Sequence, residues 1–492
     1  MSSEAPFLLV HNTLRPALER RGFSSLTAVQ LAVLTSAADS GNLRISSETG
    51  SGKTVAIGLL LGPHLVTGLA ARAAPPQGPQ ALVITPTREL AAQVGDELAW
   101  LYADVKGLDV AVVTGGTDIG RDRRTLSRRP MVVVGTPGRM LDHIRSGTLD
   151  CSKVTDVVLD EADQMLDMGF RDELDGIVEA QPETRRSHLV SATFPHAVRH
   201  FADRFQGTAT RVEGTRLGEA NQDIEHVAHL VRGNQRYDSL VNCLLSSLEE
   251  RCLVFVQRRD DAAMIAERLA ADGFSALPLS GDLPQAQRTR TLAAFRSGVV
   301  RTIVATDVAA RGIDVADIAN VVHLDLPMDS EGYTHRSGRT GRAGRKGRSV
   351  ALVPPNAQAR FRYLLRTAKV EASWLPVPTP AKIKRSLAKT SRRQLHDAIA
   401  NGPALTEAEQ AYAAKLLTDY DPAVLIARLL DLAQPSIPRQ PTEIATLQVD
   451  PRETRPRQGT QARSHQGHDR HGTRSSGKPR PGRPRPTRGA AA

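Results

Sequence analysis

Short runs of β-branched and aliphatic residues alternate with longer amphipathic segments through most of the chain. The runs that we predict as strands of a first sheet are Leu43–Ile45, Ala81–Thr85, Val110–Thr114, Met131–Gly135, Val154–Asp160 and His188–Ala192. After a polar stretch the alternation restarts, with runs at Cys252–Val256, Ala276–Leu279, Thr302–Ala305, Val321–Leu324 and Ser349–Val353. Buried strands separated by helices are typical of parallel, doubly wound sheets, so we predict two α/β domains in tandem.

Polar and proline-rich stretches set the expected boundaries. Leu14–Arg21 reads as an amphipathic helix, Gly207–Gln222 lacks periodicity, and Pro376–Pro380 separates the second domain from a helical pattern rich in leucine. We favour a helical appendage that packs on a neighbour over a separate catalytic unit. The predicted segments are a first domain over 1–206, a linker over 207–222, a second domain over 223–370, a helical extension over 371–433 and a disordered tail over 434–492.

The net charge of +11 is concentrated at the C-terminal end. Residues 451–492 hold ten Arg and one Lys against Glu453 and Asp469, a net charge of +9, and they contain no aromatic residue. Such a segment cannot bury enough apolar area to order itself, and it would bind phosphates with a steep dependence on salt. The alternative is a solubilising tail without a partner.

Cysteine content and apolar runs bear on the compartment. Cys151, Cys243 and Cys252 lack the paired spacing of a metal site. The chain does not begin with a signal-peptide pattern and has no run of about 18 apolar residues, since Pro63 and His64 interrupt the longest candidate. We therefore expect a cytoplasmic protein with reduced thiols and no membrane contact.

A glycine-containing loop between a strand and a helix carries the first chemical signal. Its residues are Ser47, Glu48, Thr49, Gly50, Ser51, Gly52, Lys53 and Thr54. Strand, small-residue loop and helix are the setting of a P-loop, in which backbone N–H groups and the helix N-terminus face phosphate oxygens. The lysine would reach the β- and γ-phosphates of ATP, and the threonine hydroxyl would bind Mg²⁺. The pattern usually begins with Gly, so Ser47 makes this a P-loop variant.

Two adjacent carboxylates end a later strand of the same domain. Val157-Val158-Leu159 leads into Asp160-Glu161-Ala162-Asp163. Ligands of open parallel sheets lie at the carboxyl ends of strands, so Asp160 is placed to hold Mg²⁺ opposite Thr54, and Glu161 to polarise an attacking water. The competing interpretation is an acidic surface turn.

These motifs occur in an order that resembles the DEAD-box RNA helicases. Besides the P-loop variant and Asp-Glu-Ala-Asp, the matching stretches are Pro86–Leu90, Thr136–Arg139, Ser191–Thr193, Leu253–Val256, Ala305–Asp314 and His335–Arg342. The match spans roughly residues 7–370 and implies two RecA-like domains that bind ATP and RNA. Residues 360–433 are similar to the extension of bacterial cold-shock DeaD-type helicases, in which a helical segment supports dimerisation. Here the basic tail stands in place of a C-terminal RNA-binding module.

The resemblance implies further contacts with ATP. In the adenine-reading motif over 7–30, Phe7 would stack on the base, Phe23 would belong to the same site and Gln30 would bond the base edge. Leu26 stands where the family usually has Pro, and a core aromatic is the alternative for Phe7. In the second domain, the resemblance assigns the nucleotide Gly312 and Asp314, and gives Asp307 a contact with the ribose.

The arginines of the last motif would complete the catalytic site. Arg339 and Arg342 resemble arginine fingers, whose permanent charge stabilises the transferred γ-phosphoryl group. Ser337 stands where the family usually has Ile and is expected to affect packing. We expect His335 to donate a hydrogen bond between the domains, and Ser191 and Thr193 to couple the state of ATP to RNA binding. The catalytic set is therefore Lys53, Asp160, Glu161, Arg339 and Arg342.

The same carry-over implies contacts with the RNA backbone. The matching positions are Pro86, Thr87, Arg88, Gly115, Gly116, Thr136, Pro137, Arg139, Gln285, Arg288 and Thr306. Contacts to phosphate and sugar fix position and carry little sequence information.

We expect an ATP-dependent RNA helicase that separates short duplexes and remodels RNA or ribonucleoprotein, with ATP and Mg²⁺ as cofactors. The alternatives are an ATP-gated RNA clamp or annealer, and a DNA helicase. Ribosomal precursors or RNA-degradation assemblies are possible partners, as is a homodimer through 382–433.

Overall fold

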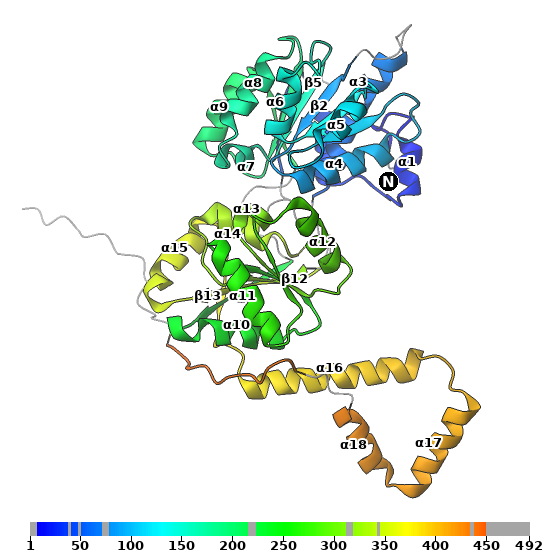
Figure 1. Ribbon diagram of the computed structural model, residues 1–492, viewed down its shortest axis with the longest axis vertical. Helices are drawn as coiled ribbons and strands as arrows, with labels where there is room; N and C mark the ends of the chain where they lie inside the picture. The colour runs from blue at the N-terminus through cyan, green and yellow to red at the C-terminus, as the bar shows by residue number, and fades with distance from the viewer. Residues whose placement is uncertain are drawn as a thin grey trace, which may run out of the picture. The chain divides into compact units, whose positions relative to one another are not determined.

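The computed structural model describes residues 7–37, 41–47, 51–70, 78–214, 223–310, 318–341, 345–432 and 437–448. All of them belong to one compact unit, Met1–Val449. The described residues form two seven-stranded sheets in which every strand pair is parallel (Figure 1). The predicted tandem of RecA-like α/β domains is confirmed.

The first sheet has the strand order β3-β4-β2-β5-β6-β1-β7. Its strands are β1 (Leu43–Ser46), β2 (Ala81–Ile84), β3 (Val110–Val113), β4 (Val132–Gly135), β5 (Asp156–Asp160), β6 (Arg186–Ser191) and β7 (Thr210–Glu213). The helices are α1 (Arg15–Arg20), α2 (Ala28–Ala37), α3 (Lys53–Ala70), α4 (Arg88–Leu101), α5 (Ile119–Leu126), α6 (Pro137–Arg145), α7 (Ala162–Asp167), α8 (Arg171–Glu179) and α9 (His196–Gln206).

The second sheet has the order β10-β11-β9-β12-β13-β8-β14. Its strands are β8 (Ile224–Leu230), β9 (Arg251–Phe255), β10 (Ala276–Leu279), β11 (Thr302–Ala305), β12 (Ile318–His323), β13 (Gly347–Val353) and β14 (Ser373–Trp374). The helices are α10 (Arg236–Leu245), α11 (Arg259–Ala271), α12 (Gln285–Arg296), α13 (Asp307–Ala310), α14 (Ser330–Ser337) and α15 (Gln358–Thr367); the extension adds α16 (Pro380–Asn401), α17 (Glu407–Asp419) and α18 (Pro422–Leu432).

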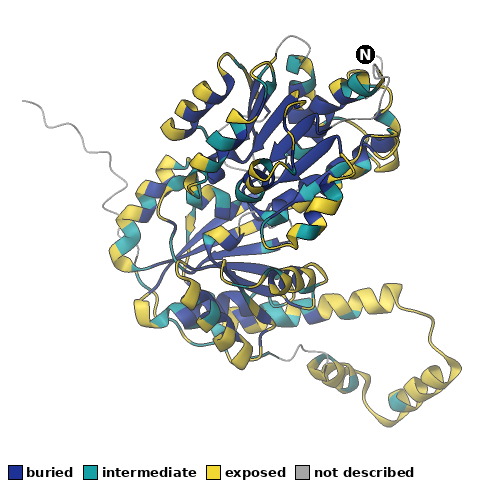
Figure 2. Cartoon of the chain, turned by 45° about the horizontal axis from the view of Figure 1, so that its top comes forward, coloured by how far each residue is buried: buried dark blue, intermediate teal, exposed yellow. Residues whose placement is uncertain are grey.

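Burial explains why the strand sequences are apolar on both faces. Every residue of β1, β2, β4 and β5 is buried, and most of the strand ribbon in Figure 2 is dark blue. Helices cover both faces of such a sheet, so alternation between polar and apolar residues is lost. The helix α3 is long and apolar enough to cross a membrane by length and composition, but it follows the P-loop and most of its first half is buried in the first domain.

Two predicted boundaries are wrong. Thr210–Glu213 is not part of a linker; it forms the edge strand β7, which pairs with β1 in the first sheet. Only one side chain of this strand is buried, so its sequence carries a weak apolar signal. The second domain also continues past residue 370, because β14 pairs with β8. Residues 215–222 of the predicted linker lie outside the described residues.

The predicted start of the tail at residue 434 is also wrong, because residues 437–448 lie on the second domain. The buried side chain of Asn242 on α10 donates hydrogen bonds to the carbonyls of Pro378, at 3.0 Å, and Thr442, at 2.7 Å. Arg439 pairs with Asp238 at 2.8 Å and with Asp272 at 2.7 Å. One buried amide therefore holds the chain where the helical extension begins and where it ends. Residues 449–492 lie outside the described residues.

Buried histidines make the second domain sensitive to acid. Burial lowers the pKa of His226 from 6.5 to about 4 and that of His323 well below 6.5. Both rings are therefore neutral in the folded protein at pH 7. The unfolded chain binds more protons between pH 6.5 and 4, so the free energy of unfolding falls as the pH falls through this window.

We predict that the preference of His226 for the neutral form lowers the free energy of unfolding by about 3 kcal/mol as the pH falls from above 6.5 to below 4. Urea unfolding at pH 7 and at pH 4.5 measures it in wild type and in His226→Gln. Between pH 7 and pH 4.5, the free energy of unfolding should fall more for wild type than for His226→Gln. A difference that does not change with pH would contradict the assignment.

Candidate nucleotide and RNA site

The P-loop variant lies between β1 and α3, at the carboxyl end of the first sheet. Ser47 is fully buried; its hydroxyl lies 2.6 Å from that of Ser51, and its carbonyl accepts a hydrogen bond from Lys53 Nζ at 3.2 Å. A side-chain hydroxyl thus braces the loop at the position where the usual pattern has Gly. Glu48, Thr49 and Gly50 lie outside the described residues, while Thr54 lies in the first turn of α3.

The adenine-reading motif is bonded to the same loop. Gln30 on α2 accepts a hydrogen bond from the Thr27 N–H at 2.9 Å and donates one to the Gly52 carbonyl at 3.3 Å. Gly52 has φ of +89°, and a Cβ there would lie 2.7 Å from Gln30 Nε2. Only glycine therefore fits where the loop meets Gln30.

The two aromatic residues of this motif are placed differently. Phe7 is 5% exposed and belongs to the hydrophobic core of the first domain. This placement favours the alternative of a core aromatic over a ring that stacks on adenine. Phe23 is partly buried, and its ring centroid lies 6.0 Å from that of Trp100.

The paired carboxylates end β5, as predicted. Asp160 is buried, and its Oδ1 has no hydrogen-bond partner among the described residues. Burial, opposed by Lys53 and reinforced by Glu161, raises the pKa of Asp160 to about 7. A buried carboxylate oxygen without a partner, near the P-loop lysine, fits a divalent cation.

Glu161 occupies the turn between β5 and α7 in a left-handed conformation, with φ of 55°. A residue other than glycine pays about 1–2 kcal/mol for this backbone, and such strain is concentrated at functional sites. The carboxylate accepts a hydrogen bond from the Gln164 side chain one turn later. The turn and this bond hold the side chain at the sheet edge.

Asp163 joins the acidic strand end to the Ser191–Thr193 motif. Its Oδ2 accepts hydrogen bonds from the Thr193 hydroxyl at 2.7 Å and from the Thr193 N–H at 3.1 Å. The Ser191 hydroxyl accepts from the Asp163 N–H at 3.4 Å and donates to the Thr193 carbonyl at 2.7 Å. From the second domain, His335 Nε2 approaches Asp163 Oδ2 to 3.9 Å. This distance is longer than a hydrogen bond and allows an ion pair when the imidazole is protonated.

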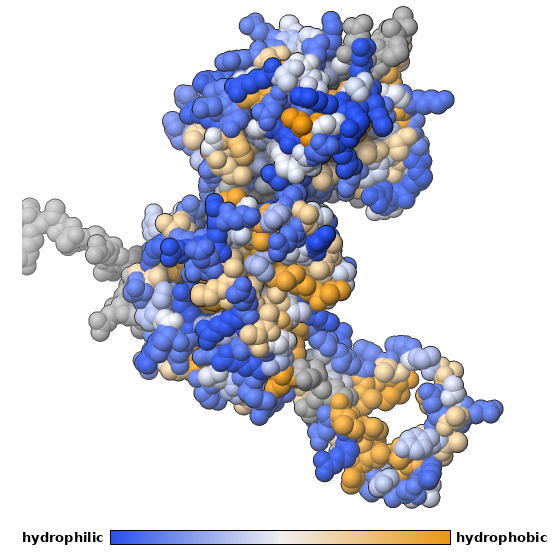
Figure 3. Space-filling view, in the orientation of Figure 1, coloured by the Kyte–Doolittle hydropathy of each residue, from blue (hydrophilic) through white to orange (hydrophobic). Residues whose placement is uncertain are grey.

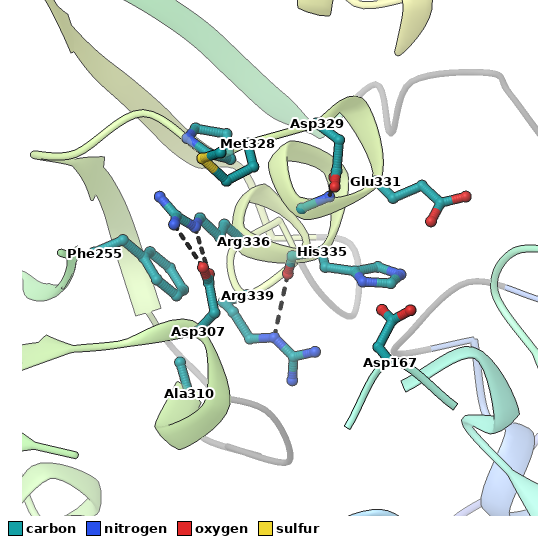
Figure 4. A pocket seen from close by; sticks show the side chains of 12 residues that line it. Asp167, Phe255, Asp307, Ala310, Met328, Asp329, Glu331, His335, Arg336 and Arg339 are labelled. Atoms are coloured by element: carbon teal, nitrogen blue, oxygen red, sulfur yellow. Dashed lines mark hydrogen bonds and ion pairs between the residues drawn. The ribbon is translucent and has the colours of Figure 1, made fainter. Parts of the chain in front are cut away.

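The second domain presents a cavity of about 230 Å³ beside α14 (Figure 4). Both oxygens of Asp307 accept hydrogen bonds from Arg336, at 2.5 and 2.7 Å, and Arg336 also lies over the ring of Phe255. Asp307 therefore orients an arginine in addition to any contact with ribose. Arg339 lines the same cavity, and its Nε donates to the His335 carbonyl at 3.3 Å. Gly312, Asp314 and Arg342 lie outside the described residues.

The predicted RNA contacts of the first domain lie in loops after β2, β3 and β4. Pro86 and Thr87 follow β2, and Thr87 caps α4 by accepting a hydrogen bond from the Leu90 N–H. Arg88 lies against Gly115 and Gly116; a Cβ on Gly116 would lie 2.0 Å from its guanidinium. This close approach, with φ of +75°, explains the second glycine.

The loop after β4 supports the glycine pair. The Thr136 hydroxyl accepts a hydrogen bond from the Gly115 N–H at 3.4 Å, and Pro137 begins α6. Arg139 is bonded to the Asp122 carboxylate and to the Thr117 carbonyl. Its guanidinium is largely buried in these contacts, so it positions the loop that carries the glycines.

Four side chains connect the predicted RNA sites of the two domains. Arg88 donates to Gln285 at 3.1 Å, and Gln285 donates to Glu89 at 3.2 Å. Arg288 pairs with Glu89 at 3.0 Å and also donates to the Ser280 carbonyl. Thr306 is buried just before α13, and its carbonyl accepts hydrogen bonds from the N–H groups of Ala309 and Ala310. The structure thus brings together residues that are about 200 positions apart in the sequence.

Sequence reasoning missed Glu89, Asp163, Gln164, Phe255 and Arg336 as functional residues. All five lie within or next to motifs that had been recognised. Their role is to hold a neighbouring side chain, and such a role becomes visible only when both partners are placed in space.

A P-loop and an acidic strand end in one α/β domain, facing an arginine-bearing helix of the next, define a two-domain P-loop ATPase. Comparison with known families agrees. The DEAD/DEAH box helicase family matches residues 27–201, and the helicase conserved C-terminal domain matches residues 235–344.

Several known proteins are similar over most of the chain. DEAD-box ATP-dependent RNA helicase CshA of Bacillus subtilis is 32% identical over 422 residues, covering 85% of this chain and 83% of that protein. ATP-dependent RNA helicase DeaD of Escherichia coli is 37% identical and covers 76% of this chain and 58% of that protein. The solved structure of S. cerevisiae Dbp5 bound to RNA and ADP BeF3 is 27% identical, with a TM-score of 0.67 over 77% of this chain and 98% of that one. The chain belongs to the DEAD-box ATP-dependent RNA helicases.

We predict that the Glu89–Arg288 pair links the two domains during RNA-stimulated hydrolysis. Removing either charge leaves the other largely buried and unpaired, so Glu89→Ala and Arg288→Ala should each lower kcat/KM for RNA roughly tenfold. The double variant should be no worse than the worse single variant, a coupling of about 1–2 kcal/mol. Arg259→Ala, which breaks the exposed pair with Asp282 in the second domain, is the matched control. Additive losses in the double variant would contradict the link.

Proposed function

We propose that this chain is an ATP-dependent RNA helicase that closes its two domains over ATP and RNA and reopens after hydrolysis. The observation that carries the proposal is the division of the site. The P-loop and the acidic residues belong to the first domain, whereas Arg336 on α14 and Arg339 just after this helix belong to the second. Since neither domain holds both sets, catalysis requires their approach.

The residues of the first domain hold and activate the reactants. Lys53 neutralises phosphate charge, and Glu161 orients the attacking water and accepts its proton. Thr54 and Asp160 would hold Mg²⁺, which when bound neutralises phosphate charge and orients the β- and γ-phosphates. The unpartnered Oδ1 of Asp160 supports this assignment.

The residues of the second domain act on the charge that develops during the reaction. Arg339 stabilises the γ-phosphoryl group in the transition state, and we assign the same role to Arg342. Approach of the second domain changes the contacts of Asp163, because this carboxylate is bonded to Thr193 and faces His335. Through Thr193 the change reaches the loops that bind RNA.

RNA binding follows the backbone and has little sequence preference. The loops with Pro86, Thr87, Gly115, Gly116 and Pro137 present N–H and hydroxyl groups suited to phosphate and sugar oxygens. Arg88, Gln285 and Arg288 add donors where the two domains meet. We also propose that the Arg-rich segment 451–492, outside the described residues, binds RNA phosphates without sequence preference.

The helical extension supports a homodimer through 382–433. The helices α17 and α18 have no fully buried residue, and they expose apolar side chains that gather on one side in Figure 3. The exposed large side chains of α17, α18 and the turn between them include Tyr412, Leu417, Tyr420, Val424, Ile426, Leu429 and Leu432. A second copy would cover this surface. We further propose a cytoplasmic protein that acts on ribosomal precursors or in RNA-degradation assemblies.

An unwinding assay distinguishes a helicase from an RNA clamp or annealer. With a short tailed RNA duplex, wild type should release the strand in the presence of ATP. Glu161→Gln should bind ATP and RNA together but lose more than a hundredfold of turnover, because the attacking water loses its base. RNA-stimulated hydrolysis without strand release would favour the clamp, and equal stimulation by DNA would favour a DNA helicase. Normal turnover by Glu161→Gln would contradict its role.

We predict that Ile426→Asp with Leu429→Asp abolishes the homodimer while sparing ATP hydrolysis per chain. Burying two carboxylates in an apolar interface is too costly for association. Light scattering coupled to gel filtration measures the mass. Met264→Asp, at an equally exposed apolar residue on α11, is the control and should remain dimeric. A wild-type protein that is monomeric at 10 µM or so would refute the dimer.

A further inference from the structure

A buried polar cluster lies behind the helix that carries the arginines. Ser337, the last residue of α14, places its hydroxyl 2.9 Å from that of Ser349 on β13 and 3.4 Å from His323 Nε2 on β12. His323 Nε2 lies 3.0 Å from the Ser349 hydroxyl. All three residues are almost fully buried. The catalytic mechanism uses none of them.

The cluster continues along α14 through Tyr333. Its hydroxyl lies 2.8 Å from His226 Nδ1. The His323 and Tyr333 rings stack with centroids 4.9 Å apart. The Ser337–Ser349–His323 group and the Tyr333–His226 pair are therefore joined through two stacked rings.

The direction of the hydrogen bonds in this cluster follows from the atom that lacks a partner. His323 Nδ1 has no hydrogen-bond partner among the described residues. A buried N–H without an acceptor costs more than a bare lone pair, so the proton of the neutral ring belongs on Nε2. His323 then donates to Ser349. The Ser349 hydroxyl hydrogen is then left to bond the Ser337 oxygen. Such directional bonds fix the rotation of α14 about its axis, whereas apolar packing is non-directional.

Arg339 lies between two residues that are anchored to the sheet. Ser337, two positions earlier, is bonded to β13 as described. Thr340, one position later, donates to the carbonyls of Ile318 at 2.5 Å and Ala319 at 3.1 Å. The intervening turn is bonded to α14, since the Arg339 N–H donates to the Arg336 carbonyl at 3.1 Å. Displacement of Ser337 is therefore transmitted to the backbone of Arg339.

We propose that Ser337 is a positioning residue for the arginine finger Arg339, acting through its hydrogen bond to Ser349. The proposal rests on the proposed role of Arg339 in hydrolysis. The Ser337 hydroxyl fixes the end of α14, and so sets the angle at which the following turn presents Arg339 to the γ-phosphate. A displaced Arg339 should slow the chemical step, because its charge stabilises the transition state more than bound ATP.

The test compares Ser337→Ala, Ser349→Ala and the double variant by their RNA-stimulated ATPase. Each single variant should lower kcat roughly threefold to tenfold, the worth of one buried hydrogen bond, with the KM for ATP within about twofold of wild type. The double variant should match the worse single variant, because both hydroxyls belong to one bond. In an Arg339→Ala background, Ser337→Ala should have no further effect on kcat.

Ser239→Ala is the matched control. Ser239 is fully buried in α10 of the same domain, and its hydroxyl donates to the Gln235 carbonyl at 2.7 Å. This variant should lose a comparable hydrogen bond yet keep the kcat of wild type. Thermal unfolding is measured for every variant, and if Ser337→Ala fails to fold, Ser349→Ala carries the test.

Three results would overturn the proposal: a kcat of Ser337→Ala within twofold of wild type, an equal loss in Ser239→Ala, or an undiminished effect of Ser337→Ala in the Arg339→Ala background. Each requires that wild type show RNA-stimulated hydrolysis. A wild-type protein without that activity would instead refute the proposed function itself.

Discussion

The Asp163 carboxylate is the contact on which the coupling between the domains depends. Its Oδ2 is held by the hydroxyl and the N–H of Thr193, and it faces His335 from the second domain at 3.9 Å. A largely buried carboxylate needs partners that satisfy its lone pairs, so any movement of His335 or Thr193 changes the balance of its hydrogen bonds. Asp163 follows Asp160 and Glu161 in the chain, and it faces His335 on α14. Asp163 is therefore one contact between the acidic strand end and the second domain, beside the Glu89–Arg288 pair.

The fold could be predicted from the sequence where burial dictates residue type. β2, β4 and β5 are buried on both faces, and their runs of Val, Leu and Ile gave strands at almost the observed positions. The edge strand β7 was missed because three of its four side chains are exposed, and β14 because it has two residues. The mostly buried strand β8 was also missed, because Glu225, His226 and His229 interrupt its apolar run. Residues 437–448 were assigned to the tail on composition. Their attachment depends on specific bonds from Asn242 and Arg439, which composition does not reveal.

The candidate site was predictable for residues that act on ATP and less so for residues that act on each other. Lys53, Asp160 and Glu161 were predicted from motif spacing, and the structure places Lys53 at the start of α3 and the two carboxylates at the end of β5. Arg336 was not predicted, since its role depends on the position of Asp307 in space. Phe7 lies in the hydrophobic core, as the alternative to a ring that stacks on adenine predicts.

The division of the site between two domains makes hydrolysis a consequence of their approach, and the distance between the domains tests this most directly. The three native cysteines are buried, so thiols introduced at Asp172→Cys and at the exposed Val299→Cys can carry a fluorescent donor and acceptor. Energy transfer should rise only when ATP and RNA are both present, fall again as ATP is hydrolysed, and stay high in the Glu161→Gln background. Hydrolysis at the full RNA-stimulated rate without any change in energy transfer would contradict the account.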